Sequence, residues 1–486
     1  MGASSTLIAR ARALYRAYDM DQLPVALRRN SIDYYYLSIY PGLKQMSSFG
    51  NLARPRYPDV IPNAYIHIPF CTGVCSFCSY FLRTVRADDL SPITAYLELV
   101  KQELALHQAE TTLDLSYIYF GGGTPSLIPP PALAELFGFL SSQRILAEQS
   151  YGAFELHPEF FGNLDVAQAF VNVLQAYGVN RVSLGLESVD QALLDRTNRR
   201  HGTSFLAQAM EFLRHNSLYV NIDLMYGLPG MTCSQWEDSL RATTACAPDS
   251  ISTYFLFIDR GTRMHAAVAR GQIDLPTHEE IQVQHIMAQI YLAECGYHEL
   301  PNDYYAKTVG DPGEFKVDSL PSDAISLPIG AGAYGYFDRT QFANVFSLAD
   351  YSDRIAKRQS PMWRGCRLDD EGLLRRDIMF GLKNSPYLDF QLFVNKYGVS
   401  PTANYAATFD LLTAYGLVEI DDALRRATLT AKGRLCVEEI SCLFRPPAKP
   451  ETDTVTSVKE LRLLEKHNFA PLYPGLDEKF TPRAET

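Results

Sequence analysis

The sequence predicts an α/β protein: a partial (β/α)6 barrel, followed by a mostly helical, winged-helix-like domain. Three observations support this prediction. Short apolar runs typical of strands alternate with longer amphipathic runs typical of helices from about residue 61 onward. Cysteine, glycine and acidic residues gather where the predicted strands end. Beyond residue 366, three helical runs precede two short strands and a last helix.

Six strands and five helices make up the predicted barrel. The strand runs are short and mostly apolar, and the helical runs between them are amphipathic. Repeated alternation favours a parallel sheet with helices on its outer face, and the chemistry of parallel barrels lies at the carboxyl ends of the strands. The predicted strands are 64–68, 116–120, 152–156, 181–185, 221–225 and 250–257, and the predicted helices are 94–107, 131–140, 166–177, 204–215 and 234–244.

Flanking segments complete the predicted organisation. Residues 1–60 form an N-terminal extension, residues 61–345 the barrel with a lid segment, and residues 366–446 the C-terminal domain. Residues 447–486 bear prolines and charges with weak periodicity, so we expect a tail. The predicted elements of the C-terminal domain are helices at 371–382, 389–397 and 401–415, strands that turn at Asp421-Asp422, and a helix that opens at Thr430.

Composition limits the classes of function. The 486 residues are 47% hydrophobic and 20% charged, as in a soluble globular protein, and the net charge of −11 disfavours nucleic acid as a partner. No apolar run approaches the roughly 18–20 residues that span a bilayer. Nine cysteines, three of them closely spaced, suit a reducing cytoplasm. We therefore expect a cytoplasmic protein with no membrane span.

The cysteine triplet Cys71, Cys75 and Cys78 has the spacing C-x3-C-x2-C. Three thiolates so close together can hold one iron–sulfur cluster, and a four-iron cluster then keeps one iron without a protein ligand. The alternative is three buried or zinc-binding cysteines. Zinc prefers four ligands, usually in paired motifs, and the other six cysteines are scattered without a second C-x2-C pair. The spacing favours the cluster.

The residues around the triplet resemble a known family. The stretch Tyr-Ile-His-Ile-Pro-Phe-Cys at 65–71 and the aromatic Phe77 before the last cysteine resemble the oxygen-independent coproporphyrinogen III oxidase-like branch of the radical S-adenosylmethionine (SAM) superfamily. The resemblance implies a radical SAM barrel with a [4Fe-4S] cluster. It also implies SAM at the open iron, cleaved to methionine and a 5′-deoxyadenosyl radical. A reductase or a flavodoxin-type protein would supply the electron.

Other unusual residues follow the predicted strands. The glycine run 121–123 before Thr124 leaves backbone amides bare for a ligand, although a tight turn would explain it equally well. Glu155 and Glu187 end two strands, and Asp223 lies within an otherwise apolar strand, where a carboxylate needs a partner. Arg199 suits a cofactor carboxylate.

The resemblance implies that these residues bind two SAM molecules. The family usually has Gln at the position of Glu187, so this residue is a departure from its pattern. For the first SAM the implied residues are Tyr65, Phe77, Gly122, Glu155 and Tyr336. For the second SAM they are Gly123, Thr124, Glu187, Arg199, Asp223 and Phe257.

Two further departures bear on the reaction. Oxidases of the family carry a fourth cysteine where this chain has Tyr80, and its heme chaperones carry a His-Asn-x-x-Tyr-Trp stretch where residues 301–305 read Pro-Asn-Asp-Tyr-Tyr. The remaining branch is that of the class C methyltransferases and cyclopropanases. There, the resemblance implies that a second SAM donates a methyl or methylene group to an sp2 carbon.

Two alternatives remain open. One is an oxygen-independent coproporphyrinogen III oxidase, which decarboxylates two propionates in porphyrin biosynthesis. The other is a heme-binding chaperone. The aromatic-rich stretch 34–42 suggests a planar or apolar small-molecule substrate and identifies nothing finer.

Overall fold

The computed structural model describes residues 6–29, 39–49, 52–199, 205–259, 261–308 and 319–446. Most of the aromatic stretch 34–42 and the whole predicted tail 447–486 lie outside these ranges. Among the described residues, no helix combines the length and the apolar character that crossing a membrane requires.

Six parallel strands in chain order form the centre of the structure, which confirms the predicted fold class. Each of the first five is longer than predicted, because its polar ends also join the ladder. The strands are β2 (Val60–Ile68), β5 (Thr112–Gly122), β6 (Leu146–Leu156), β7 (Val179–Glu187), β8 (Tyr219–Tyr226) and β9 (Ser250–Phe255).

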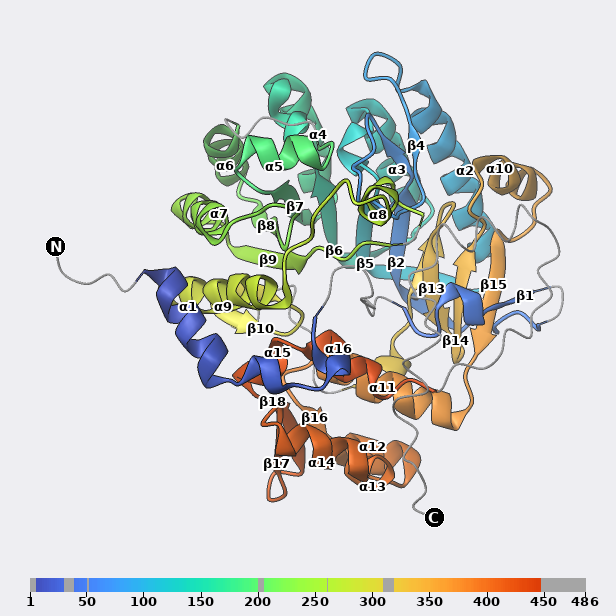
Figure 1. Ribbon diagram of the computed structural model, residues 1–486. Helices are drawn as coiled ribbons and strands as arrows, with labels where there is room; N and C mark the ends of the chain where they lie inside the picture. The colour runs from blue at the N-terminus through green and yellow to red at the C-terminus, as the bar shows by residue number, and fades with distance from the viewer. Residues whose placement is uncertain are drawn as a thin grey trace.

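Helices connect these strands and cover one side of the sheet, at the top and left of Figure 1. Each turns an apolar stripe inward, as α4 does with Phe170 and Leu174. Side-chain caps begin three of them, α4, α5 and α7; at the start of α4 the side chain of Asn163 accepts two backbone N–H groups. The connecting helices are α2 (Ser91–Gln108), α3 (Pro130–Ser142), α4 (Leu164–Ala176), α5 (Gln191–Arg196), α6 (Leu206–His215) and α7 (Cys233–Ala245).

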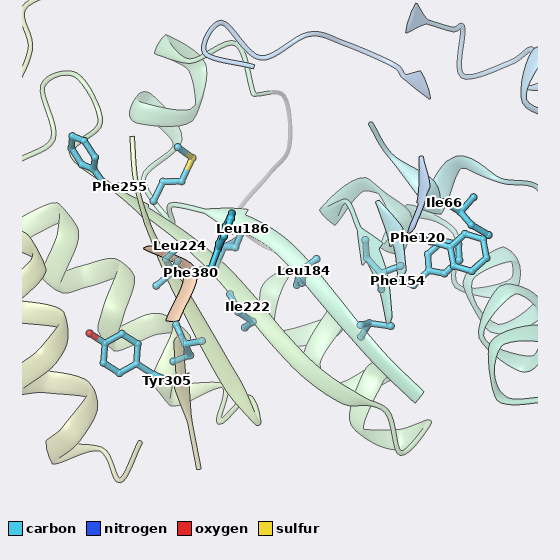
Figure 2. Packing of buried hydrophobic residues seen from close by; sticks show 14 of the residues in the cluster. Ile66, Phe120, Phe154, Leu184, Leu186, Ile222, Leu224, Phe255, Tyr305 and Phe380 are labelled. Carbon is cyan, nitrogen blue, oxygen red and sulfur yellow. The ribbon is translucent and has the colours of Figure 1, made fainter. Parts of the chain in front are cut away.

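Aromatic and aliphatic side chains from neighbouring strands fill the space between the sheet and these helices. Phe120 and Phe154 stack with ring centroids 4.6 Å apart, and Phe170 of α4 meets Phe154 edge-on. Figure 2 shows Ile66 beside the two stacked rings. Pairs of this kind stabilise a core by about 0.5–1.5 kcal/mol beyond the burial of their surface.

The segment between residues 259 and 345 differs from the predicted lid. Its short strands extend the sheet at both edges, so that the sheet has nine strands in the order β10-β11-β9-β8-β7-β6-β5-β2-β12. These strands have three residues each, too few for a pattern of alternation to be recognised in the sequence. The elements are α8 (Arg263–Ala269), α9 (His278–Glu294), β10 (His298–Leu300), β11 (Tyr304–Ala306) and β12 (Leu327–Ile329).

A second, four-stranded sheet lies beside the barrel, and it pairs a strand of the N-terminal extension with residues more than 300 positions away in the chain. Its order is β1-β15-β14-β13, from β1 (Ser47–Ser48), β15 (Met362–Arg367), β14 (Thr340–Asn344) and β13 (Tyr334–Phe337). The extension is therefore part of the folded structure.

The C-terminal domain has the helices and the two-stranded turn that the sequence predicts, with one difference. The run 401–415 is divided at Tyr405, whose backbone leaves the helical region at φ −124° and ψ 40°. Figure 1 shows this domain in orange and red, at the bottom. Its elements include α11 (Asp370–Asn384), β16 (Leu388–Asp389), α12 (Phe390–Tyr397), α13 (Pro401–Asn404), α14 (Ala406–Ala414), β17 (Val418–Asp421), β18 (Arg426–Leu429), α15 (Ala431–Arg434) and α16 (Val437–Cys442).

A buried polar cluster joins the N-terminal extension, the barrel and the C-terminal domain. The side chain of Arg29 is 1% exposed; it pairs with Glu439 of α16 at 3.2 Å and donates to the hydroxyl of Tyr226 at 2.6 Å. His285 of α9 lies 3.1 Å from Asp303 in the same cluster. Buried ion pairs and hydrogen bonds thus connect the three parts of the chain.

Candidate active site

The cysteine loop leaves the sheet after β2 and is closed at its base by β3 (Phe70–Cys71) and β4 (Arg83–Thr84). Two neighbouring segments hold its middle. The carbonyl of Thr197 accepts the backbone N–H of Ser76 at 2.8 Å, and the carbonyl of Ser76 accepts the N–H of Met264 at 2.8 Å. The loop is therefore fixed against segments that follow β7 and β9.

The three thiols lie together on this loop, and two of them accept hydrogen bonds. The hydroxyl of Thr124 lies 3.3 Å from the sulfur of Cys71, and the guanidinium of Arg199 lies 3.7 Å from the sulfur of Cys75. Burial raises the pKa of Cys71 to about 11 and that of Cys78 to about 12. Binding to metal must therefore displace these protons.

This arrangement fits an iron–sulfur cluster. Donors aimed at the sulfurs are the environment that stabilises cluster thiolates. Among the described residues, no three His, Cys, Asp or Glu side chains converge on a single metal ion. A four-iron cluster binds each thiolate at a different iron, so its ligands need not meet at one point. All nine cysteines are described and none forms a disulfide bond, and the other six lie outside this loop.

The glycine run after β5 does not offer bare amides. The N–H of Gly122 donates to Glu155 at 3.3 Å, that of Gly123 to the carbonyl of Ile68 at 2.8 Å, and that of Thr124 to the carbonyl of Phe70 at 2.7 Å. The glycines instead allow the end of β5 to approach the strand that leads into the cysteine loop. This corrects the reasoning from the sequence, in which the run supplied free donors.

Buried carboxylates from three successive strands lie close enough to affect one another. Glu155 accepts hydrogen bonds from the Tyr119 hydroxyl at 2.8 Å and the Gly122 amide, yet burial raises its pKa to about 7. Burial also raises the pKa of Asp223 to about 7, although Asn221 donates to it at 2.7 Å. The charge of Glu187 adds to both shifts. Such a concentration of negative charge suits a cationic ligand.

Arg199 contacts both this group of acids and the cysteine loop. Its guanidinium lies 3.2 Å from the carboxylate of Glu187 and donates to the carbonyl of Gly185 at 2.5 Å. Burial opposes its charged form, but Glu187 and Cys75 outweigh burial and raise the pKa of Arg199. The arginine predicted to bind a ligand carboxylate is thus already paired within the protein.

Two residues of β2 form a second layer behind the cysteine loop. The Nε2 of His67 lies 2.9 Å from the carbonyl of Phe81, and its Nδ1 lies 2.9 Å from the hydroxyl of Tyr65. Burial lowers the pKa of His67 to about 4, so the ring is neutral. Nε2 then donates to the carbonyl, and Nδ1 accepts from the Tyr65 hydroxyl. His67 was missed from the sequence, although its two-residue spacing from Tyr65 places both on one face of the strand.

The remaining predicted residues are Phe77, Phe257 and Tyr336, and their described contacts are with the apolar core or with other parts of the chain. Phe77 and Phe257 are half-buried and pack against the main core. Tyr336 is 3% exposed, and its ring lies under the guanidinium of Arg376 of α11 at 3.8 Å. The hydroxyl of Tyr336 lies 3.4 Å from the carbonyl of Ser322. These contacts bind Tyr336 to α11 and to residues 320–323.

Asp259, after β9, was also missed. The side chain of Ser79, next to Cys78, is hydrogen-bonded to it, yet burial raises its pKa to about 6. Its Oδ2 atom is buried without a hydrogen-bond partner. No periodic signal marks this residue in the sequence, because it lies beyond the strand.

Comparison with known proteins shows what the chain is similar to. Residues 65–243 match the family described as Radical SAM superfamily. The heme chaperone HemW of Bacillus subtilis is 26% identical over 387 residues, which cover 79% of this chain and 98% of that protein. The oxygen-independent coproporphyrinogen III oxidase of Bradyrhizobium diazoefficiens is 26% identical over 398 residues, covering 78% of this chain and 86% of that protein.

A solved structure has the same fold. Coproporphyrinogen III oxidase (HemN) from Escherichia coli matches with a TM-score of 0.70 and 24% identity, over 85% of this chain and 96% of that one. The likeness therefore extends through the barrel and into the C-terminal domain.

Proposed function

Because the chain belongs to the radical SAM superfamily, in its oxygen-independent coproporphyrinogen III oxidase-like family, we propose that its cysteine loop and acidic strand ends bind two SAM molecules beside a small-molecule substrate. The family's cofactors are a [4Fe-4S] cluster and SAM. The observation that carries the proposal is the concentration of three partly buried carboxylates on the neighbouring strands β6, β7 and β8: Glu155, Glu187 and Asp223.

The residues of the chain divide the work of binding. Cys71, Cys75 and Cys78 would hold the cluster, which supplies the electron that cleaves SAM to methionine and a 5′-deoxyadenosyl radical. Thr124 and Arg199 keep two of the sulfurs oriented. These donors also replace hydrogen bonds from water, which matters because the thiols are largely buried.

Charge supports the presence of two SAM molecules. Each SAM carries a sulfonium and an ammonium group, and a buried carboxylate complements either. Glu187 is already neutralised by Arg199, whereas the hydrogen bonds to Glu155 and Asp223 come from neutral donors: the Tyr119 hydroxyl, the Gly122 amide and the Asn221 side chain. One carboxylate is therefore left for each of two cationic ligands. Positioning both beside a substrate carbon lowers the barrier by several kcal/mol.

We propose that the second SAM is a methyl or methylene donor to an sp2 carbon of the substrate. Tyr80 supports this proposal, because this chain has an exposed tyrosine, not a cysteine, at the position of the oxidases' fourth cysteine. The first radical would take a hydrogen atom from the second SAM, and the carbon radical so formed would add to the substrate. A second electron from the external reductant and loss of S-adenosylhomocysteine would then give the methylated or cyclopropanated product.

Oxidative decarboxylation of coproporphyrinogen III is the second candidate. Its support is the likeness, over about four-fifths of this chain, to relatives named as that oxidase. Heme binding without turnover is the third, from the likeness to relatives named as heme chaperones. Both candidates call for a tetrapyrrole, and methylene transfer does not.

The products of SAM separate these reactions. The protein is reconstituted anaerobically with iron and sulfide, reduced, and incubated with SAM and an extract of the source organism, with coproporphyrinogen III in a parallel tube. Comparable amounts of 5′-deoxyadenosine and S-adenosylhomocysteine, both dependent on the extract, are the expected result. Deoxyadenosine alone, with decarboxylated porphyrinogen, would establish the oxidase. Retained heme with neither nucleoside would establish the chaperone.

A further inference from the structure

Arg199 contacts two chemically different partners at once: the sulfur of Cys75 at 3.7 Å and the carboxylate of Glu187 at 3.2 Å. We propose that this pair sets the reduction potential of the cluster, with Arg199 raising the potential and Glu187 holding it down. The inference rests on the proposed cluster at Cys71, Cys75 and Cys78. It adds a role for Glu187 and Arg199 that does not depend on SAM.

The geometry places the charge where a reduced cluster needs it. The side chains of Arg199 and Glu187 are 12% and 13% exposed, so water screens their charges little. Of the two terminal nitrogens of Arg199, Nη1 is directed at the sulfur, while Nη2 is held by Glu187 and by the carbonyl of Gly185. This fork fixes the guanidinium against the sulfur. Its Nε atom is buried without a hydrogen-bond partner, which favours an additional anion nearby.

Reduction changes the charge of this site by one unit. A single electron passes from an external low-potential reductant, such as dithionite, to the cluster, and no bond of the protein forms or breaks. A cation and a hydrogen bond at a cluster sulfur stabilise the more negative, reduced form, so Arg199 raises the potential. A nearby carboxylate destabilises that form, so Glu187 lowers it.

The backbone of Glu187 indicates that its position is maintained at some cost. Its φ of 63° lies in the left-handed region, where a residue with a side chain is strained, and the pairing of β7 with β8 shifts register between Gly185 and Glu187. This strained turn aims the carboxylate at Arg199. An uncharged Gln would accept a hydrogen bond from Arg199 in the same place but would leave its full positive charge facing Cys75.

The test is a redox titration of the reconstituted protein without SAM. Electron paramagnetic resonance detects the reduced cluster at each potential, and the titration gives its midpoint potential. Omitting SAM removes any effect of a lost SAM contact. We expect Glu187→Gln to shift the midpoint potential upward and Arg199→Gln to shift it downward, while Arg199→Lys, which keeps the charge, stays close to the original value. Asp165→Asn is the matched control, because it removes one exposed negative charge on α4, where water and salt screen it.

Opposite signs in Glu187→Gln and Arg199→Gln are the decisive result, since a purely structural role would not shift the potential in two directions. Equal potentials in all variants, or shifts of the same sign, would overturn the inference. Glu187→Gln is nearly isosteric, so it keeps the test valid if Arg199→Gln assembles no cluster. Failure of the underlying proposal is recognised separately, because Cys75→Ala would then retain a full cluster.

Discussion

Gly122 and His67 approach so closely that no side chain fits between them: a Cβ built on Gly122 would lie 2.6 Å from the imidazole ring. The backbone of Gly122 also has a φ of 112°, which residues with side chains rarely adopt. Since His67 is hydrogen-bonded to Phe81 of the cysteine loop, the end of β5 bears directly on the position of that loop.

Gly122→Ala should therefore disturb the cysteine loop. We expect a destabilisation of about 1–3 kcal/mol, from strain and overpacking together, and a lower iron content after reconstitution. Urea unfolding and iron analysis measure the two effects. Gly73→Ala is the control, since a Cβ at Gly73, within the cysteine loop, has no heavy atom within 4 Å. Equal behaviour of the two variants would contradict this account.

Cys75→Ala should remove the brown cluster chromophore, because the loop offers only three thiolates and the cluster needs all of them as ligands. Absorbance near the visible charge-transfer bands and iron and sulfide content provide the measurement. Cys295→Ala, which changes an exposed cysteine, should keep the chromophore. A full cluster in Cys75→Ala would refute the ligand assignment.

Asp223→Ala should keep the cluster and weaken SAM cleavage. The carboxylate of Asp223 lies in β8 and accepts a hydrogen bond from Asn221, which also donates to Ser183 and Ser252. It provides negative charge for a cationic ligand. The formation of 5′-deoxyadenosine under reducing conditions is the measurement, with cluster content from the visible spectrum as the internal control. Unchanged turnover would remove Asp223 from the site.

Glu155→Gln should make the cluster-free protein more stable at pH 8 and about equally stable at pH 5. Burial raises the pKa of Glu155 in the folded state to about 7, above its ordinary value of 4.5. Below about pH 4.5 the carboxyl is protonated in both the folded and the unfolded state. As the pH rises from about 4.5 to about 7, only the unfolded state ionises freely, so the free energy of unfolding falls. Gln has no charge to lose; its one amide oxygen can accept the Gly122 N–H, and its NH2 group can donate to the Tyr119 hydroxyl. Thermal unfolding of the variant and of the original protein at both pH values tests this. The same difference in stability at pH 5 and pH 8 would exclude the raised pKa of Glu155.

Arg29→Met should destabilise the protein by about 3–5 kcal/mol, because it leaves Glu439 buried without its cation. The double change Arg29→Met with Glu439→Leu should recover much of the loss, since an apolar pair replaces the ion pair. Urea unfolding of both single variants and the double variant completes the cycle. Additive losses in the double variant would show that the two residues act independently.

The sequence predicted the six central strands and most helices well, and it erred where contacts join distant segments. The five predicted helices begin and end within about three residues of their predicted bounds, because an amphipathic repeat is a local feature, whereas the six-residue α5 was not predicted. The strands of β10, β11 and β12 escaped prediction. They form because the edges of the sheet offer hydrogen-bond partners. A three-residue segment carries no pattern in the sequence from which such pairing could be predicted.

The candidate site shows the same division. Spacing alone identified Cys71, Cys75 and Cys78, whereas Tyr65 came from the family resemblance and its partner His67 was missed. The carboxylates were recognised as polar residues at strand ends. Their partners were not recognisable, because hydrogen bonds to Glu155 come from a neighbouring strand and a glycine amide.

By itself the sequence determined the order of strands and helices, the cysteine spacing and the clustering of acids at strand ends, since each depends on residues close together in the chain. Only the tertiary structure decided that Arg199 meets Cys75, 124 residues away, that Glu187 neutralises it, and that the amides after β5 are already bonded. The physical reason is that charge and hydrogen bonding act over a few ångströms in space. Which groups come within that range is set by the packing of the whole sheet.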